Sequence, residues 1–410
     1  MYINSIVKSD GKARSLKKDL RRAVLNGSGM QRVANRHPWI FRSNLIQIPV
    51  CEPGDLIAVA DREGNVVARG LWSESELCIR ILTFGSHEPD QMALLRKRAE
   101  EALALRKRWC GDGEAFRWVH GEADGLPGIS ADLYGDVLSL QLSVFGWYRH
   151  AEEVAKIFRK IRKLSAVILR NDTKYLRKEG IPQEVKPLLG SMPGKPLCVR
   201  IGDHLELIDV AEGQKTGTYL DVRNVPALLD PVYKGARVLD CFAYQGHFTI
   251  HALAHGAAEV TVIDQSQTAL DRAKENILLN DLPADRAVMR CGNAFDIMRE
   301  LDGNRERYDV VIMDPPPFSP SRAQLDSARR GYKELAVRGL RRLSSGGHMI
   351  FMSCSHAFSA QMLMETLAEA AKDADKVCRV VREIHQPYDH PALLSVPETD
   401  YLKGFVLGVE

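Results

Sequence analysis

Residues 237–247 read Arg-Val-Leu-Asp-Cys-Phe-Ala-Tyr-Gln-Gly-His, and this stretch decides the fold. Its apolar start is typical of a buried strand, and its end opens a helix expected over residues 248–258. The alternation of strand and helix begins at about residue 197 and indicates a doubly wound parallel sheet, so the sequence predicts an α/β fold for this half of the chain. Further strands are expected at 259–264, 308–314 and 347–353, and further helices at 267–280, 327–343 and 359–374.

Polar residues stand where the expected strands end. Asp240 ends the first strand, Asp264 the second and Asp314 the fourth, while Asn293 and Ala294 follow the third. Ligands of open α/β sheets bind at the carboxyl ends of the strands, where Asp264 can bond a ribose diol and Asn293 an adenine edge. A single Asp after a strand most often caps a helix or turn. Four such ends in order predict a site for a cofactor that contains a nucleoside.

The loop after the first strand separates two kinds of nucleoside cofactor. A pyrophosphate cradle uses three glycines, whereas residues 241–247 contain only Gly246. S-adenosylmethionine carries no phosphate and does not need that cradle. The loop therefore favours S-adenosylmethionine and opposes a dinucleotide oxidoreductase.

The chain before residue 193 divides into three parts. Residues 1–29 form a basic extension, and residues 30–88 read as short strands broken by turns, the rhythm of a small β-barrel. Residues 89–192 combine a helix expected at 90–109 with later strands and a basic helix, which predicts an α+β domain. Gly and Pro cluster at 190–196 as in a linker, so the α/β domain is expected over 193–410.

Positive charge gathers at the N-terminal end. Residues 1–45 contain ten Lys or Arg residues against Asp10 and Asp19, a net charge of +8 in a chain whose total is +3. This distribution predicts a polyanionic partner, and a solvated tail is the alternative for residues 1–28. Arg36 and Arg42 alternate with Trp39 and Phe41, a set suited to phosphates and base stacking. The two aromatic residues are equally suited to a barrel core.

The eight cysteines form no C-x-x-C pair, so neither a zinc site nor a redox couple is expected, and no metal is predicted. No apolar run reaches the length of about 18 residues that a membrane span needs. The N-terminus lacks the apolar region of a signal peptide. These features predict a cytoplasmic protein.

Seven stretches match one family in order. They are Arg36-His-Pro-Trp-Ile-Phe41, Glu122-Ala-Asp-Gly-Leu-Pro-Gly128, Lys215-Thr-Gly-Thr-Tyr-Leu-Asp-Val-Arg223, Asp314-Pro-Pro-Pro-Phe318, Arg330-Gly-Tyr-Lys333, Ser353-Cys-Ser355 and Tyr401-Leu-Lys-Gly-Phe405. On these stretches the chain resembles the large-subunit ribosomal RNA methyltransferase I family, which modifies cytosine at carbon 5. The resemblance implies an N-terminal PUA domain, a central α+β domain and a C-terminal Rossmann-like domain. It implies ribosomal RNA as partner and leaves a homodimer open.

The resemblance and the strand ends together supply candidate site residues. The nucleophile would be Cys354, and Asp314 would also act in catalysis. Residues expected to bind S-adenosylmethionine are Lys215, Thr216, Tyr219, Asp221, Arg223, Asp240, Phe242, Ala243, Tyr244, Gly246, Asp264, Asn293, Ala294 and Asp314. The chain departs from the family at Pro317, where Lys is usual, and at Gln245-Gly246-His247, where Thr-Gly-Gly is usual.

The chemistry depends on Cys354. A thiolate that adds to carbon 6 of cytosine makes carbon 5 nucleophilic, and Asp314 can bond the amino edge of the base. The target base must leave any helix, and Arg329, Arg330 and Lys333 are expected to reach the RNA backbone beside it.

Two alternatives remain open at this point. Asp314-Pro-Pro-Pro-Phe318 also resembles the loop of enzymes that methylate nitrogen and need no cysteine. A non-catalytic RNA-binding or ribosome-assembly protein is the other alternative, which the intact strand-end residues oppose.

Overall fold

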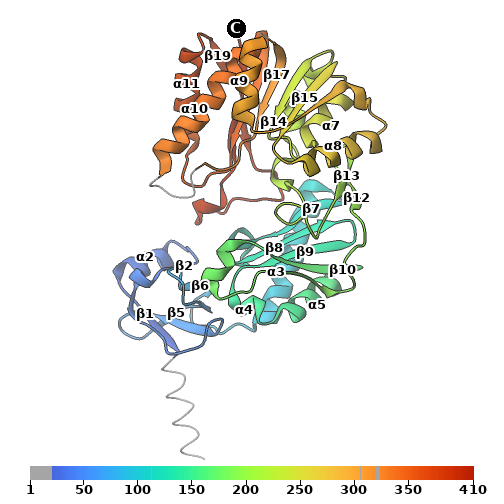
Figure 1. The fold of residues 1–410 in the computed structure, drawn as a ribbon. Coiled ribbons are helices and arrows are strands. Elements are labelled where there is room, and N and C mark those ends of the chain that lie inside the picture. Colours follow the sequence, from blue (N-terminus) through green and yellow to red (C-terminus); the bar gives the residue numbers. More distant parts are fainter. Residues whose placement is uncertain (1–20, 112, 305, 319–323) are drawn as a thin grey trace, which may run out of the picture.

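The computed structural model describes residues 21–111, 113–304, 306–318 and 324–410. Three parts follow one another along the chain and contact their neighbours (Figure 1). The basic residues expected to bind RNA at positions 8–18 lie outside the described residues. Among the helices described, none is both long and apolar enough to cross a membrane.

The first part is a six-stranded sheet of order β2-β6-β5-β4-β1-β3, mostly antiparallel, with β1 parallel to β4. Its elements are β1 (Arg22–Leu25), α2 (Gly27–Ala34), β2 (Trp39–Ile40), β3 (Leu45–Gln47), β4 (Leu56–Ala60), β5 (Val66–Trp72) and β6 (Ile79–Phe84). The sheet begins at Arg22, so the part of the expected extension from residue 22 to 29 belongs to this domain instead. Ala23 and Leu25 are fully buried in its core, which four residues beside a basic run could not reveal.

The second part is a five-stranded sheet of order β11-β10-β9-β8-β7, covered by two long helices. Its strands are β7 (Ala115–His120), β8 (Ile129–Tyr134), β9 (Val137–Leu142), β10 (Ala166–Asn171) and β11 (Glu184–Leu189). Helices α3 (Gln91–Cys110), α4 (Phe145–Tyr148) and α5 (Ala151–Ile161) complete it. Trp118 and Phe158 meet edge to face at 5.0 Å between ring centroids, which joins β7 to α5 in an apolar core. The expected α+β layout is present.

The third part contains a seven-stranded sheet of order β16-β15-β14-β17-β18-β20-β19 (Figure 1). Its strands are β14 (Arg237–Cys241), β15 (Glu259–Asp264), β16 (Ala287–Cys291), β17 (Tyr308–Met313), β18 (Leu343–Ser353), β19 (Cys378–His385) and β20 (Lys403–Val409). Its long helices are α7 (His247–Ala254), α8 (Gln267–Leu279), α9 (Ala294–Asn304), α10 (Leu325–Arg342) and α11 (Ala360–Asp373). The five strands from β16 to β18 run parallel. Strand β20 is antiparallel to both β18 and β19, and neither β19 nor β20 was expected.

A hairpin precedes this sheet where the sequence predicted strand–helix alternation. Strands β12 (Leu197–Ile201) and β13 (His204–Ile208) pair antiparallel, and Leu207 and Leu205 donate backbone N–H groups to Asn276 and Asn280 of α8. The doubly wound sheet itself therefore starts at β14. Strand β14 lies between β15 and β17, so the order of the strands reverses at β14. A ligand site is expected at the carboxyl end of the strand where the order reverses.

Candidate active site

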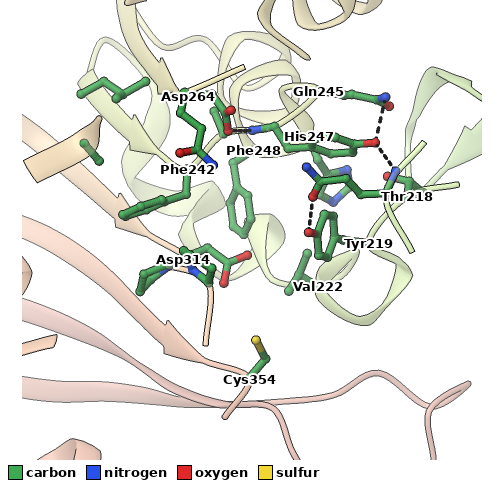
Figure 2. A pocket seen from close by; sticks show the side chains of 18 of the residues that line it. Thr218, Tyr219, Val222, Phe242, Gln245, His247, Phe248, Asp264, Asp314 and Cys354 are labelled. Atoms are coloured by element: carbon green, nitrogen blue, oxygen red, sulfur yellow. Dashed lines mark hydrogen bonds between the residues drawn. The ribbon is translucent and has the colours of Figure 1, made fainter. Parts of the chain in front are cut away.

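A cavity of about 290 Å³ opens at the carboxyl ends of β14, β15, β17 and β18, near the lower end of the size range of small-molecule pockets. Figure 2 shows Asp264 at the top of the view, Cys354 at the bottom, and Asp314 between them. The cavity therefore lies where the strand-end residues predicted a cofactor.

Most of the residues predicted from the sequence are among those that line the cavity. They are Lys215, Tyr219, Asp221, Phe242, Ala243, Tyr244, Asp264, Asn293, Ala294, Asp314 and Cys354. They come from the segment before β14, from the ends of the four strands β14 to β17 and from the turn after β18. The fold brings together residues that are up to 139 positions apart, from Lys215 to Cys354.

Four other predicted cofactor residues support the wall from behind. Thr216 is buried against Asp132, and Arg223 pairs with Asp389 at 2.9 Å. Asp240 accepts a hydrogen bond from Thr249 at 2.6 Å, and burial raises the pKa of its carboxyl to about 6.

Gly246 is the fourth of these residues and precedes α7 with φ of +81°. An added Cβ would lie 2.9 Å from the Cβ of Ala273, so the close approach of α7 to α8 requires glycine. None of the four lines the cavity, and a direct contact of any of them with the cofactor stays a prediction.

The sequence reasoning missed several lining residues. Glu206 reaches the cavity from the hairpin, and His247 and Phe248 from the start of α7. Of these three residues, only His247 had been noticed in the sequence, as a departure from the pattern of the family. Nothing in the sequence placed a hairpin residue beside the cofactor loop.

The loop between β14 and α7 holds a strained backbone. Phe242 and Tyr244 have φ of +64° and +49°, in the left-handed region that side chains with a Cβ disfavour. Asp264 holds the loop, because its carboxylate accepts the N–H of Tyr244 and the N–H of Ser266, both at 2.9 Å. Lys215 across the cavity has φ of +52°. Such strain gathers at functional sites.

Asp221 carries the strongest charge contacts in the cavity wall. Lys215 Nζ lies 2.6 Å from its Oδ2, to which Tyr401 also donates a hydrogen bond at 2.8 Å. Burial opposes ionisation, but the pair with Lys215 holds the pKa of Asp221 well below its usual range. The other oxygen, Oδ1, is buried without a hydrogen-bond partner among the described residues, as is Oε1 of Gln245. These two free acceptors suit the ammonium and hydroxyl donors of S-adenosylmethionine, so the residues present fit that cofactor.

Cys354 lies in a turn that follows β18 and is fixed from two sides. The N–H of Ser355 donates to Ser353 Oγ at 3.3 Å, and the buried Lys403 on β20 donates to the carbonyls of Ser355 and Phe358 at 2.7 and 3.1 Å. Burial and the carboxylate of Asp314 raise the pKa of the Cys354 thiol to about 11. Burial and the charge of Asp221 raise the pKa of Asp314 itself to about 7.

Several basic and aromatic residues expected on an RNA surface have partners within the chain. Arg329 pairs with Glu369 of α11, and Lys333 contacts Glu369 and Asp373 at 3.3 and 3.0 Å. Trp39 donates to Glu122 at 2.8 Å, and Arg42 lies over the ring of Trp72 at 5.5 Å.

Comparisons with known proteins follow the same division of the chain. A family model described as an S-adenosylmethionine-dependent methyltransferase matches residues 196–399, and one described as a PUA-like domain matches residues 24–84. A methyltransferase from Streptococcus mutans has a similar fold, with a TM-score of 0.81 at 16% identity over 94% of this chain and 99% of that chain. A crystal structure of the methyltransferase SMU.776 complexed with SAH gives the same score.

Sequence relatives extend over nearly the whole chain. Ribosomal RNA large subunit methyltransferase I of Alteromonas mediterranea is 35% identical over 94% of this chain and 98% of its own length. The protein of the same name from Salmonella arizonae is 34% identical over 95% of this chain and 97% of its own length. The chain therefore belongs to the ribosomal RNA large subunit methyltransferase I family of S-adenosylmethionine-dependent enzymes.

Proposed function

We propose that this chain methylates carbon 5 of a cytosine in large-subunit ribosomal RNA through a covalent adduct with Cys354. The position of Cys354 carries the proposal, since its thiol lies in the same cavity as Asp314 and the residues that fit the cofactor. The RNA substrate follows from the names of the relatives and from the PUA-like domain.

S-adenosylmethionine supplies an electrophilic methyl group when it is bound. Asp264 and the loop that it holds would bind the nucleoside, while Asp221 and Gln245 would accept hydrogen bonds from the amino-acid end. Phe242 and Phe248 give the cavity apolar walls, which suit the adenine ring and exclude water.

Cys354 would act on the base. Its thiolate sulfur forms a bond to carbon 6 of cytosine, and the electron pair of the carbon 5–carbon 6 double bond moves so that carbon 5 becomes nucleophilic. Carbon 5 then takes the methyl group and loses its proton, and the sulfur leaves carbon 6 with the return of the double bond. The enzyme emerges unchanged, with one proton released for each methyl group transferred.

Asp314 would hold and polarise the base. With its pKa near 7, it can carry a proton to the ring nitrogen or, when ionised, accept a hydrogen bond from the amino group. Proton transfer to the ring nitrogen draws electron density from carbon 6 and favours the attack of the thiolate, whereas the hydrogen bond from the amino group holds the base in place.

Nitrogen methylation is the second candidate, because residues 314–318 of the Asp-Pro-Pro-Pro-Phe loop line the cavity. In that chemistry Cys354 would be a structural thiol and the base nitrogen would attack the methyl group directly.

The test is a map of modified nucleotides in ribosomal RNA from a strain that lacks this gene. We expect one 5-methylcytosine to disappear, to return with the wild-type gene, and to stay absent with Cys354→Ala. Cys110→Ala, a change at another partly buried free thiol, is the matched control and should restore the mark. Loss of an N-methylated base, or rescue by Cys354→Ala, would reject the proposal.

A further inference from the structure

Three metal-binding side chains converge behind the cavity wall, where the hairpin meets α7. His204 and Glu206 belong to β13, and His247 is the first residue of α7. Nε2 of His204 lies 2.9 Å from Oε1 of Glu206 and 3.2 Å from Nδ1 of His247, and that Nδ1 lies 2.6 Å from the same oxygen. The side chains of His204 and Glu206 are 3% and 1% exposed. Three donor atoms therefore face one point in a buried place.

The contacts of the other nitrogen in each imidazole ring determine which nitrogen carries the proton. Nε2 of His247 lies 3.1 Å from the carbonyl oxygen of Arg223, an acceptor only, so that nitrogen carries a proton. Nδ1 of His204 lies 3.2 Å from a carboxylate oxygen of Asp203 and carries a proton for the same reason. In the neutral rings the other two nitrogens then direct lone pairs at Glu206, which is itself an acceptor. In this state three acceptors face one another, and either an added proton on one ring or a metal ion between them would satisfy all three.

We propose that His204, Glu206 and His247 bind one divalent transition-metal ion of the zinc class. Two imidazoles and a carboxylate are a ligand set of zinc sites, and metal-bound histidines almost always donate their other N–H to a carboxylate or carbonyl. Bonds of about 2.0–2.1 Å in a tetrahedral site place ligand atoms about 3.3 Å apart, so the three atoms, now 2.6 to 3.2 Å apart, need to separate by less than about 1 Å. A water can complete the tetrahedron on the cavity side, because Glu206 and His247 also line the cavity.

Further histidine and aspartate side chains lie next to this triad. His251 and His255 follow His247 at intervals of one helical turn, and His251 bonds Asp230 at 2.6 Å. Two overlapping groups could also hold an ion, namely Asp203 with His204 and His251, and Asp230 with His251 and His255. Asp203 and Asp230 are 55% and 42% exposed, however, so the buried triad binds first. The prediction of no metal rested on the spacing of the cysteines, and this group contains only histidines and a carboxylate.

The ion would join two segments that build the cavity wall. It would tie the hairpin to α7, and through the N–H of His247 to the carbonyl of Arg223 at the end of residues 215–223. Its role is therefore structural, and zinc should raise the unfolding temperature of the protein without being a reactant.

The test uses the untagged full chain, freed of metal by a chelator and titrated with zinc chloride in a calorimeter. We expect one zinc ion per chain, and a loss of affinity of more than about tenfold in His204→Gln and in His247→Gln. His385→Gln is the control, because His385 and Glu383 form an exposed pair with 3.5 Å between their side-chain atoms and belong to no group of three ligands among the described residues. Its zinc affinity should equal that of the wild type.

Three outcomes would overturn the proposal. The first is absence of zinc uptake by the wild type, and the second is unchanged affinity in both glutamine variants. The third is a loss of binding in His251→Gln alone, which would move the ion to the neighbouring group. If the glutamine variants fail to fold, cobalt replaces zinc in the wild type: intense visible bands of tetrahedral cobalt support the triad, and the weak spectrum of octahedral cobalt contradicts it.

Discussion

The thiol of Cys354 is held in surroundings that oppose its ionisation. Burial and the neighbouring carboxylate of Asp314 keep the proton on sulfur, and Lys215 only partly offsets them. In the proposed mechanism the thiolate would have to form when RNA binds, as the base covers Asp314 and the carboxylate shares its charge with the amino group. Without RNA, the protonated thiol would be protected from oxidation and alkylation.

The influence of Asp314 on this thiol can be measured directly. Asp314→Asn removes the negative charge, so the pKa of Cys354 should fall and its alkylation by iodoacetamide at pH 9 should speed up about three- to tenfold, since each pKa unit is a factor of ten in thiolate. Mass spectrometry of the Cys354 peptide gives the rate separately from the other cysteines. Asp172→Asn, at an exposed carboxylate away from the cavity, should leave the rate unchanged. A slower or unchanged rate in Asp314→Asn would mean that the carboxylate does not act on the thiol.

Asp264 is the residue on which cofactor affinity should depend most. Asp264→Ala releases the N–H groups of Tyr244 and Ser266 and the strained loop between them, and we expect binding of S-adenosylmethionine to weaken by about 1–3 kcal/mol. Calorimetry measures it, with Asp271→Ala on the exposed face of α8 as control. Equal affinities in the two variants would exclude Asp264 from the site.

Among single residues, those that line the cavity could be predicted from the sequence more often than those that support its wall. The positions of Asp264 and Asp314 could be predicted because a strand and the residue at its end are recognised from a few neighbouring residues, and ligands bind at the carboxyl ends of such strands. Thr216 and Arg223 share a motif with lining residues, yet their partners, Asp132 and Asp389, lie far away in the chain. Only the assembled structure determines those pairs.

Among the elements, α3 is joined to its surroundings by one buried charge. Arg106 makes two hydrogen bonds to Asp124 at 2.5 and 2.7 Å and donates to the carbonyls of Arg117 and Asp389. Its side chain is fully buried, and that of Asp124 is 4% exposed. It therefore connects the helix, the central sheet and the C-terminal domain at one point.

Arg106→Met should destabilise the protein by about 3–5 kcal/mol, because it leaves the buried carboxylate of Asp124 without its cation. Urea unfolding followed by circular dichroism measures this, and Arg108→Met, at an exposed position of the same helix, should change stability by less than about 0.5 kcal/mol. A loss below about 1 kcal/mol for Arg106→Met would show that Asp124 finds other partners.

Elements with a strong period were predictable and those without one were not. The sequence located β15 to the residue and α8 to within one residue, since both repeat their apolar pattern over several turns or pairs. Strand β19 was missed because five consecutive residues from Arg379 to Glu383 are exposed, so no apolar alternation marks it. The β12–β13 hairpin was missed because its partner is α8 rather than a neighbour in sequence.

At the scale of the whole molecule, contacts between the three parts hold the cavity in relation to the PUA-like domain. Glu179 of the central part pairs with Arg80 of β6 at 3.1 Å and accepts hydrogen bonds from Ser73 and Ser75 in the loop between β5 and β6. Trp39, an expected base-stacking residue, donates a hydrogen bond to Glu122 of the central part, and its stacking on a base stays a prediction. No pattern in the sequence could separate these two roles of an aromatic residue.

The predicted electrostatic attraction to RNA can be tested at basic residues before the first sheet, of which Lys17 and Lys18 lie outside the described residues. Arg21 lies 3.5 Å from Asp55, and Arg22 donates to the carbonyl of Gly64, so both serve the first sheet. Replacing Lys17 and Lys18 by Gln should lower the slope of log affinity against log salt by up to about 2. Filter binding with a fragment of large-subunit RNA measures the slope. The control is the replacement of Lys97 and Lys107 on α3 by Gln. An equal decrease of the slope in this control would mean that the attraction to RNA does not depend on the N-terminal lysines.

The central claim is that Cys354 bonds to the target base, and a trapped adduct tests it most directly. The wild-type enzyme is incubated with S-adenosylmethionine and RNA that carries 5-fluorocytosine at the target, where fluorine cannot leave carbon 5 as a proton does. We predict a protein–RNA complex that survives denaturation, contains one methyl group and maps to the Cys354 peptide, and that Cys354→Ala cannot form although it still binds cofactor and RNA. Methyl transfer by Cys354→Ala to unmodified RNA, with no trapped complex in the wild type, would contradict the account and leave nitrogen as the methylated atom.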